Sequence, residues 1–217
     1  PLWSRGLGDV YKRQVYLPDT YQVNDSKRVI SSKDFTRAEL GLPKEGFVFC
    51  CFNKSYKINP AIFDSWMRIL RAVEGSVLWL LDNNTLSTNN LKREAVSRGI
   101  SPERLVFAER TSLANHLARH RCADLFLDTW PYNAHTTASD ALWSGVPVLT
   151  LIGKSFAARV AASLLTAIDL PELITYSVDE YEQIAITLAI QVDRMDVLKK
   201  SYPIKGFRLN CSARVHM

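Results

Sequence analysis

The sequence lacks the features that mark several large classes of protein. No apolar run approaches the roughly 20 residues that a membrane-spanning helix needs, and no segment resembles the apolar region of a signal peptide. Glycine and proline are scarce, at nine residues each, which argues against fibrous and disordered chains. We therefore expect a soluble globular protein with no membrane partner, and 217 residues suffice for one sizeable domain.

Cysteine is also scarce, and its spacing matches no metal site. Cys50, Cys51, Cys122 and Cys211 form no CxxC pair, and the spacings of His and Cys fit no zinc ligand set. Reduced and mostly buried thiols in a cytoplasmic protein are the prediction, with no metal and no cofactor. No GxGxxG follows an apolar run, which disfavours a dinucleotide-dependent oxidoreductase.

Charge of one sign is only in modest excess. Lys and Arg together outnumber Asp and Glu by 27 to 22, which gives a net charge of +5. The basic residues are scattered along the chain rather than gathered on one face, so a nucleic-acid partner is not indicated. An anionic small ligand fits this excess equally well.

What the sequence does contain is an alternation of short apolar runs and helical patterns. The apolar runs predict strands at residues 47–52, 76–81, 104–108, 124–128 and 147–151. The helical patterns predict helices at residues 60–73, 89–98, 113–120, 155–167 and 178–191, and a further helix within residues 133–150 that has His135, Thr136 and Thr137 at its first turn. Capping residues support several of these boundaries: Asn59 before Pro60, Ser112, and Ser177 with Glu180 in a capping box, while Gly99 ends a helix.

Strands that alternate with helices are typical of parallel sheets with right-handed crossovers. We therefore predict an α/β fold, a Rossmann-like parallel sheet flanked by helices, over residues 47–200. Residues 1–14 show no periodicity and resemble a spurious leader, and residues 15–46 read as a linker. Residues 201–217 lose the helical pattern, as expected of an aberrant or truncated tail.

The stretch NAHTTASDALWSGVPVLT suggests a site for phosphate. Ligands of parallel sheets collect at the carboxyl ends of the strands, where a helix N-terminus offers free N–H groups and partial positive charge. His135, Thr136 and Thr137 add side-chain donors at such an end. Asp140 lies one turn further on and is placed to accept from ribose hydroxyls. The alternative is structural: Thr often caps helices, and an acidic residue in a first turn complements the helix dipole.

Two further loops carry candidate residues at predicted strand ends. Lys54 and Lys57 follow the first strand, where a lysine can neutralise a diphosphate, although loop lysines are usually just solvated. His116 and Arg119 lie on nearly one helical face after the third strand. The histidine could stack on a base and the arginine could pair with a phosphate, or both could belong to a solvated helix edge.

Four separated blocks of the sequence resemble one family. FCCFNKSYKINPAIFDSWMRIL, VLWLL, RLVFAERTSLANHLARHRCADLFLDTWPYNAHTTASDALWSGVPVLT and GKSFAARVAASLL resemble the O-linked N-acetylglucosaminyltransferases, glycosyltransferase family 41, over about residues 15–200. The bacterial members, usually fused to tetratricopeptide (TPR) repeats, are the nearest match. The resemblance implies the C-terminal, donor-binding half of a GT-B glycosyltransferase, with the N-terminal catalytic half and the repeats absent from residues 1–46.

The resemblance also assigns roles to individual residues. Lys57 matches the family lysine that stabilises the departing UDP, and His135, Thr136 and Thr137 match its phosphate contacts. The remaining matches concern the nucleoside: His116 packs on uracil, Arg119 is the downstream arginine, Thr111 lies where backbone groups read uracil, and Asp140 holds the ribose. Two positions depart from the animal enzymes, since Lys54 replaces Gln and Leu113 replaces a ribose-contacting Lys.

The resemblance thus implies inverting, metal-free transfer of N-acetylglucosamine from UDP to Ser or Thr hydroxyls of a protein acceptor. Three alternatives stay open at this point. The same fold could use UDP-glucose for transfer to Asn, or GDP-fucose for transfer to Ser or Thr. The chain could also be a nucleotide-binding fragment that is inactive by itself, because half a cleft positions no acceptor.

Overall fold

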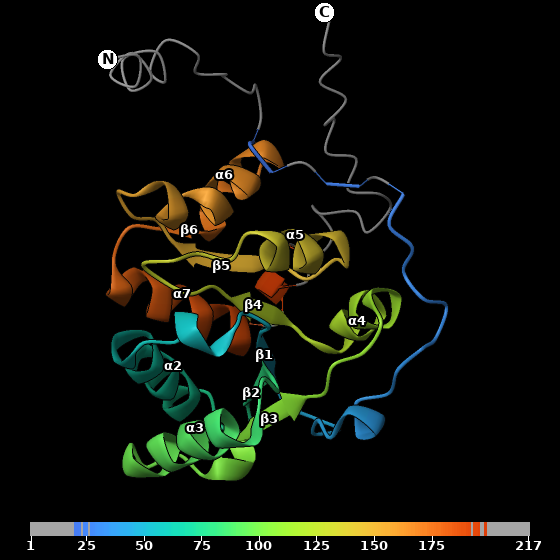
Figure 1. The fold of residues 1–217 in the computed structure, drawn as a ribbon. Helices are drawn as coiled ribbons and strands as arrows, with labels where there is room; N and C mark the ends of the chain where they lie inside the picture. Colours follow the sequence, from blue (N-terminus) through green and yellow to red (C-terminus); the bar gives the residue numbers. More distant parts are fainter. Residues whose placement is uncertain (1–19, 23, 26, 192, 196–197, 199–217) are drawn as a thin grey trace, which may run out of the picture.

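The computed structural model describes residues 20–22, 24, 25, 27–191, 193–195 and 198. Its centre is a six-stranded parallel sheet with the strand order β3-β2-β1-β4-β5-β6 (Figure 1). This architecture confirms the predicted Rossmann-like α/β fold. The predicted leader and tail, residues 1–14 and 201–217, lie outside the described residues. The strands are β1 (Val48–Cys51), β2 (Val77–Leu81), β3 (Leu105–Ala108), β4 (Leu125–Leu127), β5 (Val148–Leu151) and β6 (Ile174–Thr175).

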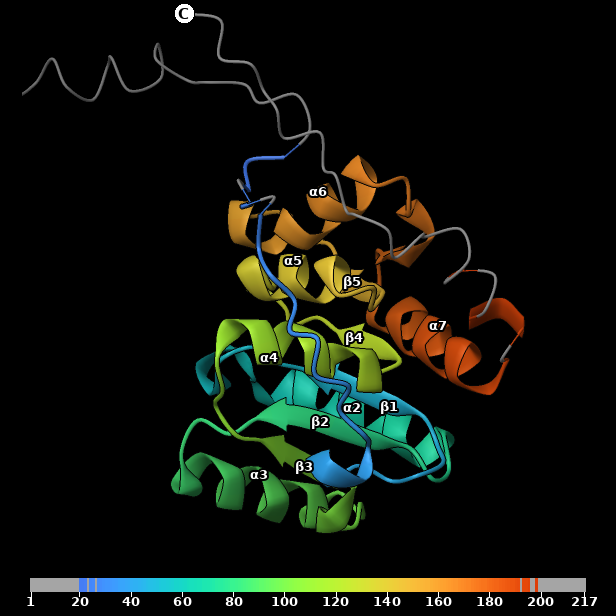
Figure 2. The same cartoon turned by 90° about the vertical axis from the view of Figure 1, so that its right-hand side faces the viewer.

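Helices cover both faces of this sheet (Figure 2). On one face α2 packs beside α7, and on the other α5 contacts both α4 and α6. The helices are α2 (Pro60–Ala72), α3 (Thr85–Ser97), α4 (Leu113–Arg119), α5 (Thr136–Trp143), α6 (Val160–Ala167) and α7 (Val178–Ile190). Short 3-10 turns complete the described elements: η3 (Ala38–Leu40), η4 (Ser55–Lys57), η5 (Pro102–Arg104), η6 (His120–Cys122), η7 (Phe156–Ala158) and η8 (Pro171–Leu173).

The predicted caps mostly hold. The side chain of Asn59 accepts a hydrogen bond from the Ile62 amide at 3.1 Å, and that of Ser112 accepts from the Asn115 amide at 3.4 Å. Gly99 follows α3 with a φ of +75°, the left-handed conformation that favours glycine after a helix. Local signals therefore fixed these helix ends correctly.

Two predicted helix boundaries were wrong. The helix expected from residue 89 begins at Thr85, because the Asn84 side chain accepts from the Ser87 amide at 2.8 Å and caps an earlier start. The helix expected over 155–167 is split into η7 and α6. The carbonyls of Ala157 and Ala158 accept from the amides of Asn133 and Gly153, at 2.9 and 2.8 Å, and the α-helix begins only at Val160.

Two smaller features also differ from the prediction. The two-residue strand β6 pairs with β5 but is too short to give a sequence pattern. The predicted capping box of α7 is half formed: the Ser177 hydroxyl accepts from the Glu180 amide at 3.1 Å, whereas the Glu180 carboxylate accepts from the Tyr176 amide at 2.7 Å. In a full capping box that carboxylate would bond to the amide of Ser177.

The core explains why the strand runs are continuously apolar. All four residues of β1 are buried, since the strand lies in the middle of the sheet with helices on both sides. Cys50, Cys51 and Cys122 are free and buried, which confirms the prediction for the described cysteines, and Cys211 lies outside the described residues. No helix of the described chain is long and apolar enough to cross a membrane. The cytoplasmic location stays a prediction.

The described residues before β1 cross the helical face of the domain, and their role as a linker stays a prediction. Figure 2 shows them running over α5 and α4 towards η3. The Ser31 amide donates to the Ala114 carbonyl at 3.0 Å, and Arg37 forms a 2.8 Å ion pair with Asp124 beside β4. These residues therefore pack on the domain.

Candidate functional site

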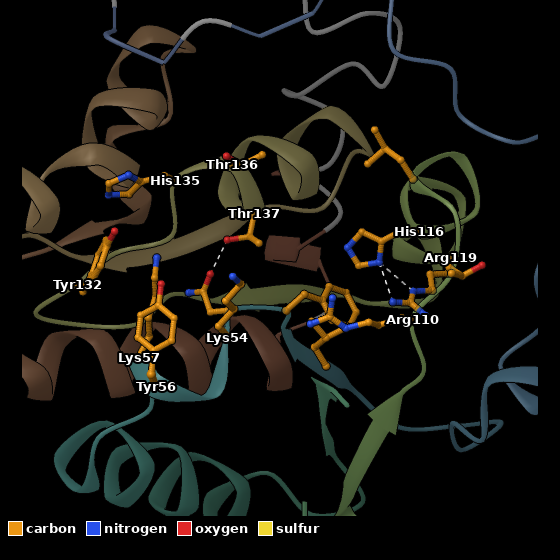
Figure 3. Close-up of a pocket in the computed structure, with 15 residues that line it drawn as sticks. Lys54, Tyr56, Lys57, Arg110, His116, Arg119, Tyr132, His135, Thr136 and Thr137 are labelled. Atoms are coloured by element: carbon orange, nitrogen blue, oxygen red, sulfur yellow. Dashed lines mark hydrogen bonds between the residues drawn. The ribbon is translucent and has the colours of Figure 1, made fainter. Parts of the chain in front are cut away.

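A cavity of about 550 Å³ opens at the carboxyl ends of the central strands (Figure 3). The strand order reverses between β1 and β4, which is the point where open parallel sheets bind their ligands. The loops that follow β1, β3 and β4 all reach this cavity. Eight of the nine predicted donor-site residues line it: Lys54, Lys57, Thr111, His116, Arg119, His135, Thr136 and Thr137.

The N-terminus of α5 faces this cavity without a side-chain cap. His135 is the N-cap residue, and its side chain makes no capping hydrogen bond. Thr136 and Thr137, at the first two helical positions, both line the cavity. The Thr137 hydroxyl donates to the Asn53 side chain, so its backbone amide is the group left for a ligand. An uncapped helix start beside a cavity attracts an anion through its N–H groups and dipole.

Lys57 brings a cation to the same wall. Its Nζ donates to the Asn133 carbonyl at 2.8 Å and lies 3.9 Å from the centre of the Tyr132 ring. Burial lowers the pKa of Lys57, and the nearby carboxylate of Asp128 opposes that shift. The Asn133 carbonyl and the Tyr132 ring thus hold the ammonium group in place at the cavity wall.

His116 and Arg119 form the opposite wall as a joined pair. The guanidinium of Arg119 contacts His116 Nδ1 through Nε and Nη2, at 3.0 and 2.7 Å, and donates to the Glu109 carbonyl at 2.6 Å. Burial lowers the pKa of His116 to about 3, helped by His120 and Arg119, so the imidazole is neutral. A neutral ring that lines a cavity suits packing against a base. The guanidinium of Arg119 is directed to His116 and Glu109. A phosphate contact by Arg119 stays a prediction.

The ring of His135 is held beside Tyr132, on the same side of the cavity as Lys57. The Tyr21 hydroxyl lies 2.7 Å from His135 Nδ1, and the rings of Tyr132 and Phe156 pack edge-on at 5.3 and 6.3 Å between centres. Burial lowers the pKa of His135, and Lys57 lowers it further. This imidazole is therefore placed by residues from three different segments of the chain.

Asp140 is the predicted site residue that the structure does not bring to the cavity. It is 6 % exposed and forms an ion pair with Arg28, which also donates to the Ser139 hydroxyl at 3.3 Å. Burial raises the pKa of Asp140, and Arg28 opposes that shift. Sequence spacing alone did not reveal Arg28 as the partner, because the two residues are 112 positions apart. A ribose contact by Asp140 stays a prediction.

Several cavity residues were missed at the level of sequence. Asn53 is buried and bridges the two sides of the sheet reversal, since its side chain accepts from Thr137 and donates to the Thr129 hydroxyl at 2.8 Å. Arg110 and Tyr132 also line the cavity. Asn53, Arg110 and Tyr132 all lie in loops that follow strands. That position could have identified them as candidates from the sequence. Within the described part of the chain, no cluster of three or more His, Cys, Asp or Glu is placed to hold a metal ion.

Comparisons with known proteins agree on one family. The model of Glycosyl transferase family 41 matches residues 18–208. A UDP-N-acetylglucosamine--peptide N-acetylglucosaminyltransferase from Caenorhabditis elegans is 40% identical over 160 residues, which are 74% of this chain and 14% of that protein. The Arabidopsis thaliana protein named "Probable UDP-N-acetylglucosamine--peptide N-acetylglucosaminyltransferase SEC" is 36% identical over 206 residues, 92% of this chain and 21% of that protein. The chain thus spans about a fifth or less of these relatives.

Solved structures agree with the sequence matches. A mutant of the Thermobaculum terrenum O-GlcNAc transferase matches with a TM-score of 0.70 at 34% identity, covering 72% of this chain and 31% of that one. The putative UDP-N-acetylglucosamine 2-epimerase from Listeria monocytogenes matches with a TM-score of 0.53 at 16% identity, covering 82% of this chain and 46% of that one, which supports the fold alone.

Proposed function

Because this chain belongs to glycosyl transferase family 41, we propose that it is the donor-binding half of an inverting GT-B glycosyltransferase. The parent enzyme would transfer N-acetylglucosamine from UDP to Ser or Thr hydroxyls of proteins. One observation carries the proposal: Lys57, His116 and the first turn of α5 line a single cavity at the sheet reversal. Similarity to proteins named as UDP-N-acetylglucosamine--peptide N-acetylglucosaminyltransferases supports the choice of donor and acceptor.

The proposed chemistry is stabilisation of a leaving group. As the glycosidic bond breaks, negative charge grows on the β-phosphate of UDP. The α5 amides and the Lys57 ammonium would stabilise that charge, while the neutral wall of His116 would hold the base. We propose that no metal takes part, since these groups supply the positive potential. Turnover by the parent enzyme should then persist in excess EDTA, and loss of turnover that Mg²⁺ or Mn²⁺ restores would contradict this step.

We expect the isolated chain to bind nucleotide but not to transfer sugar. Transfer also needs a positioned acceptor, which we assign to an N-terminal catalytic half and, as in TPR-associated bacterial members, to a repeat region. Donors other than UDP-N-acetylglucosamine remain rivals, namely UDP-glucose and GDP-fucose. Mass spectrometry of an acceptor incubated with the parent enzyme and each donor separates these possibilities.

Titration calorimetry with the purified 217-residue chain tests the binding half of the proposal. UDP should bind, and Lys57→Ala should weaken it about tenfold or more, since one charge-assisted contact is lost. Lys44→Ala is the matched control, because Lys44 is exposed and outside the cavity. Absence of UDP binding by the wild-type chain would remove both the transferase and the nucleotide-binding interpretation.

A further inference from the structure

The loop of residues 129–134, between β4 and α5, forms the cavity wall next to Lys57. Its Asn133 carbonyl accepts the hydrogen bond from Lys57 Nζ, and its Tyr132 ring lies under the same ammonium group. Its last residue, Ala134, directly precedes the N-cap His135. The position of this loop therefore sets both where Lys57 points and where α5 begins.

Asp128 precedes this loop and is fully buried behind it. Asp128 Oδ1 accepts from the amides of Thr129 and Ala134, at 2.7 and 2.6 Å, and these are the first and last residues of the loop. Asp128 Oδ2 accepts from the Thr150 hydroxyl on β5 at 2.7 Å. One carboxylate oxygen thus closes the loop at both ends, and the other ties it to the neighbouring strand.

The charge of Asp128 has no directly bonded cation among the described residues. Its three hydrogen-bond donors are neutral, and the titratable groups that interact with it are Lys57, Cys51 and Tyr181. Burial raises the pKa of Asp128 to about 7, opposed by the Thr150, Ala134 and Thr129 hydrogen bonds and by Lys57. Of the three titratable groups, Lys57 alone is a cation, so the two residues stabilise each other's charged form.

We propose that Asp128 is a positioning residue of the donor cavity. Its carboxylate holds both ends of loop 129–134 and supplies the negative charge behind the Lys57 ammonium. The inference rests on the proposed function, in which Lys57 stabilises the diphosphate, but Asp128 itself does not line the cavity. An Asn side chain at this position keeps the oxygen for both amides and offers an NH₂ to Thr150, yet carries no charge. An Ala side chain offers neither.

The first test needs no ligand. The pKa of Lys57 is measured by NMR on chain labelled with ¹³C in lysine, with the resonance assigned through Lys57→Arg. Asp128→Asn should lower the pKa of Lys57 by about one unit, because a nearby opposite charge is lost. Asp169→Asn is the control, since Asp169 is exposed, does not line the cavity and is not among the groups that shift the pKa of Lys57, and it should leave that pKa unchanged. An unchanged value in Asp128→Asn overturns the proposal.

The second test measures UDP binding by calorimetry between pH 6 and 10. The Asp128→Asn variant should bind UDP within about threefold of the wild-type affinity at pH 7. As pH rises, it should lose that affinity at a lower pH than the wild-type chain does, because Lys57 deprotonates earlier. Asp128→Ala should bind about tenfold or more weakly at every pH, because the loop is released. A purely structural role predicts a lower Tm with wild-type affinity and pH profile in the folded variants, and that result overturns the proposal.

The two tests separate the failure of this inference from the failure of the proposed function. If the wild-type chain binds no UDP, the proposed function fails, whereas the pKa of Lys57 in Asp128→Asn still decides the role of Asp128. If Asp128→Ala does not fold, Asp128→Asn decides the outcome alone through both measurements.

Discussion

The two walls of the cavity, one formed by α4 and the other by loop 129–134 with Lys57, differ in the charge of their buried polar groups. On the α4 wall, burial keeps His116 neutral by lowering its pKa to about 3, and it lowers the pKa of the adjacent, fully buried His120 to about 4. On the wall of loop 129–134, a buried carboxylate and a half-buried ammonium face each other without direct contact, and burial raises the pKa of Asp128 to about 7. The comparison suggests a division of work, in which a neutral wall accepts a base and a charged wall accepts a diphosphate.

The largest effect that would break this comparison is loss of the charged wall. In the full-length parent, Lys57→Ala or His135→Ala should reduce kcat by roughly a hundredfold or more, since one preorganised donor typically contributes about 3 to 4 kcal/mol. Steady-state kinetics with a peptide acceptor measures this, with Lys44→Ala as control. Near wild-type turnover in both variants would remove the diphosphate assignment.

The next prediction concerns how the buried histidines His116 and His120 make the free energy of unfolding depend on pH. The folded-state pKa values of His116 and His120 lie below the ordinary 6.5, so the unfolded chain binds more protons and stability is lost as pH falls from about 6.5 towards 3. His120→Phe keeps an aromatic ring against Phe52 and removes one titrating group. We expect it to reduce the loss between pH 6.5 and 4 by on the order of 3 kcal/mol, measured by urea unfolding.

The charged wall should respond to pH in the opposite sense. The pKa of Asp128 is raised in the folded state, so its contribution to stability is present below about pH 4 and lost as pH rises through about 7. Asp128→Asn should therefore increase the loss of unfolding free energy as pH falls from about 6.5, whereas His120→Phe should reduce that loss. Slopes that change in the same direction in both variants would contradict the assigned protonation states.

A smaller effect tests the bridge between the walls. Asn53→Ala leaves the hydroxyls of Thr129 and Thr137 without their buried partner and should lower the free energy of unfolding by about 1 to 3 kcal/mol. UDP affinity should fall as well, because the first turn of α5 loses its tie to β1. Asn83→Ala serves as the control, since Asn83 also follows a strand but its side chain donates to the Leu81 carbonyl and lies outside the cavity. Unfolding curves that coincide for the two variants would argue against the bridge.

The smallest effect sharpens the role of the two lysines after β1. Lys54 lines the cavity but is exposed, so its charge is screened by solvent and salt. Lys54→Gln should change UDP affinity by less than about threefold at 0.15 M salt, whereas Lys57→Ala should change it far more. Equal losses of UDP affinity in the two variants would show that both lysines contribute to binding, rather than Lys57 alone.

The sequence alone determined the order of the first five strands and of the α-helices between them. Continuous apolar runs such as Val48–Cys51 predict strands that are buried on both faces. Capping residues such as Asn59 are also readable from the sequence, because they bond to an amide only three positions further along the chain. The loops that carry Lys57, His116 and Thr136 were also predictable, because ligands gather where parallel strands end. Even there the boundary at Thr85 was missed, since a weak periodic pattern hides an early cap.

Only the tertiary structure decided which polar groups meet. Asn53 and Thr137 are 84 positions apart, and Arg28 and Asp140 are 112 apart. Local propensity carries no information about such pairs, because they depend on how the crossovers bring strand ends together. Burial then sets protonation states, as for Asp128, and burial is a property of the packed fold rather than of the chain.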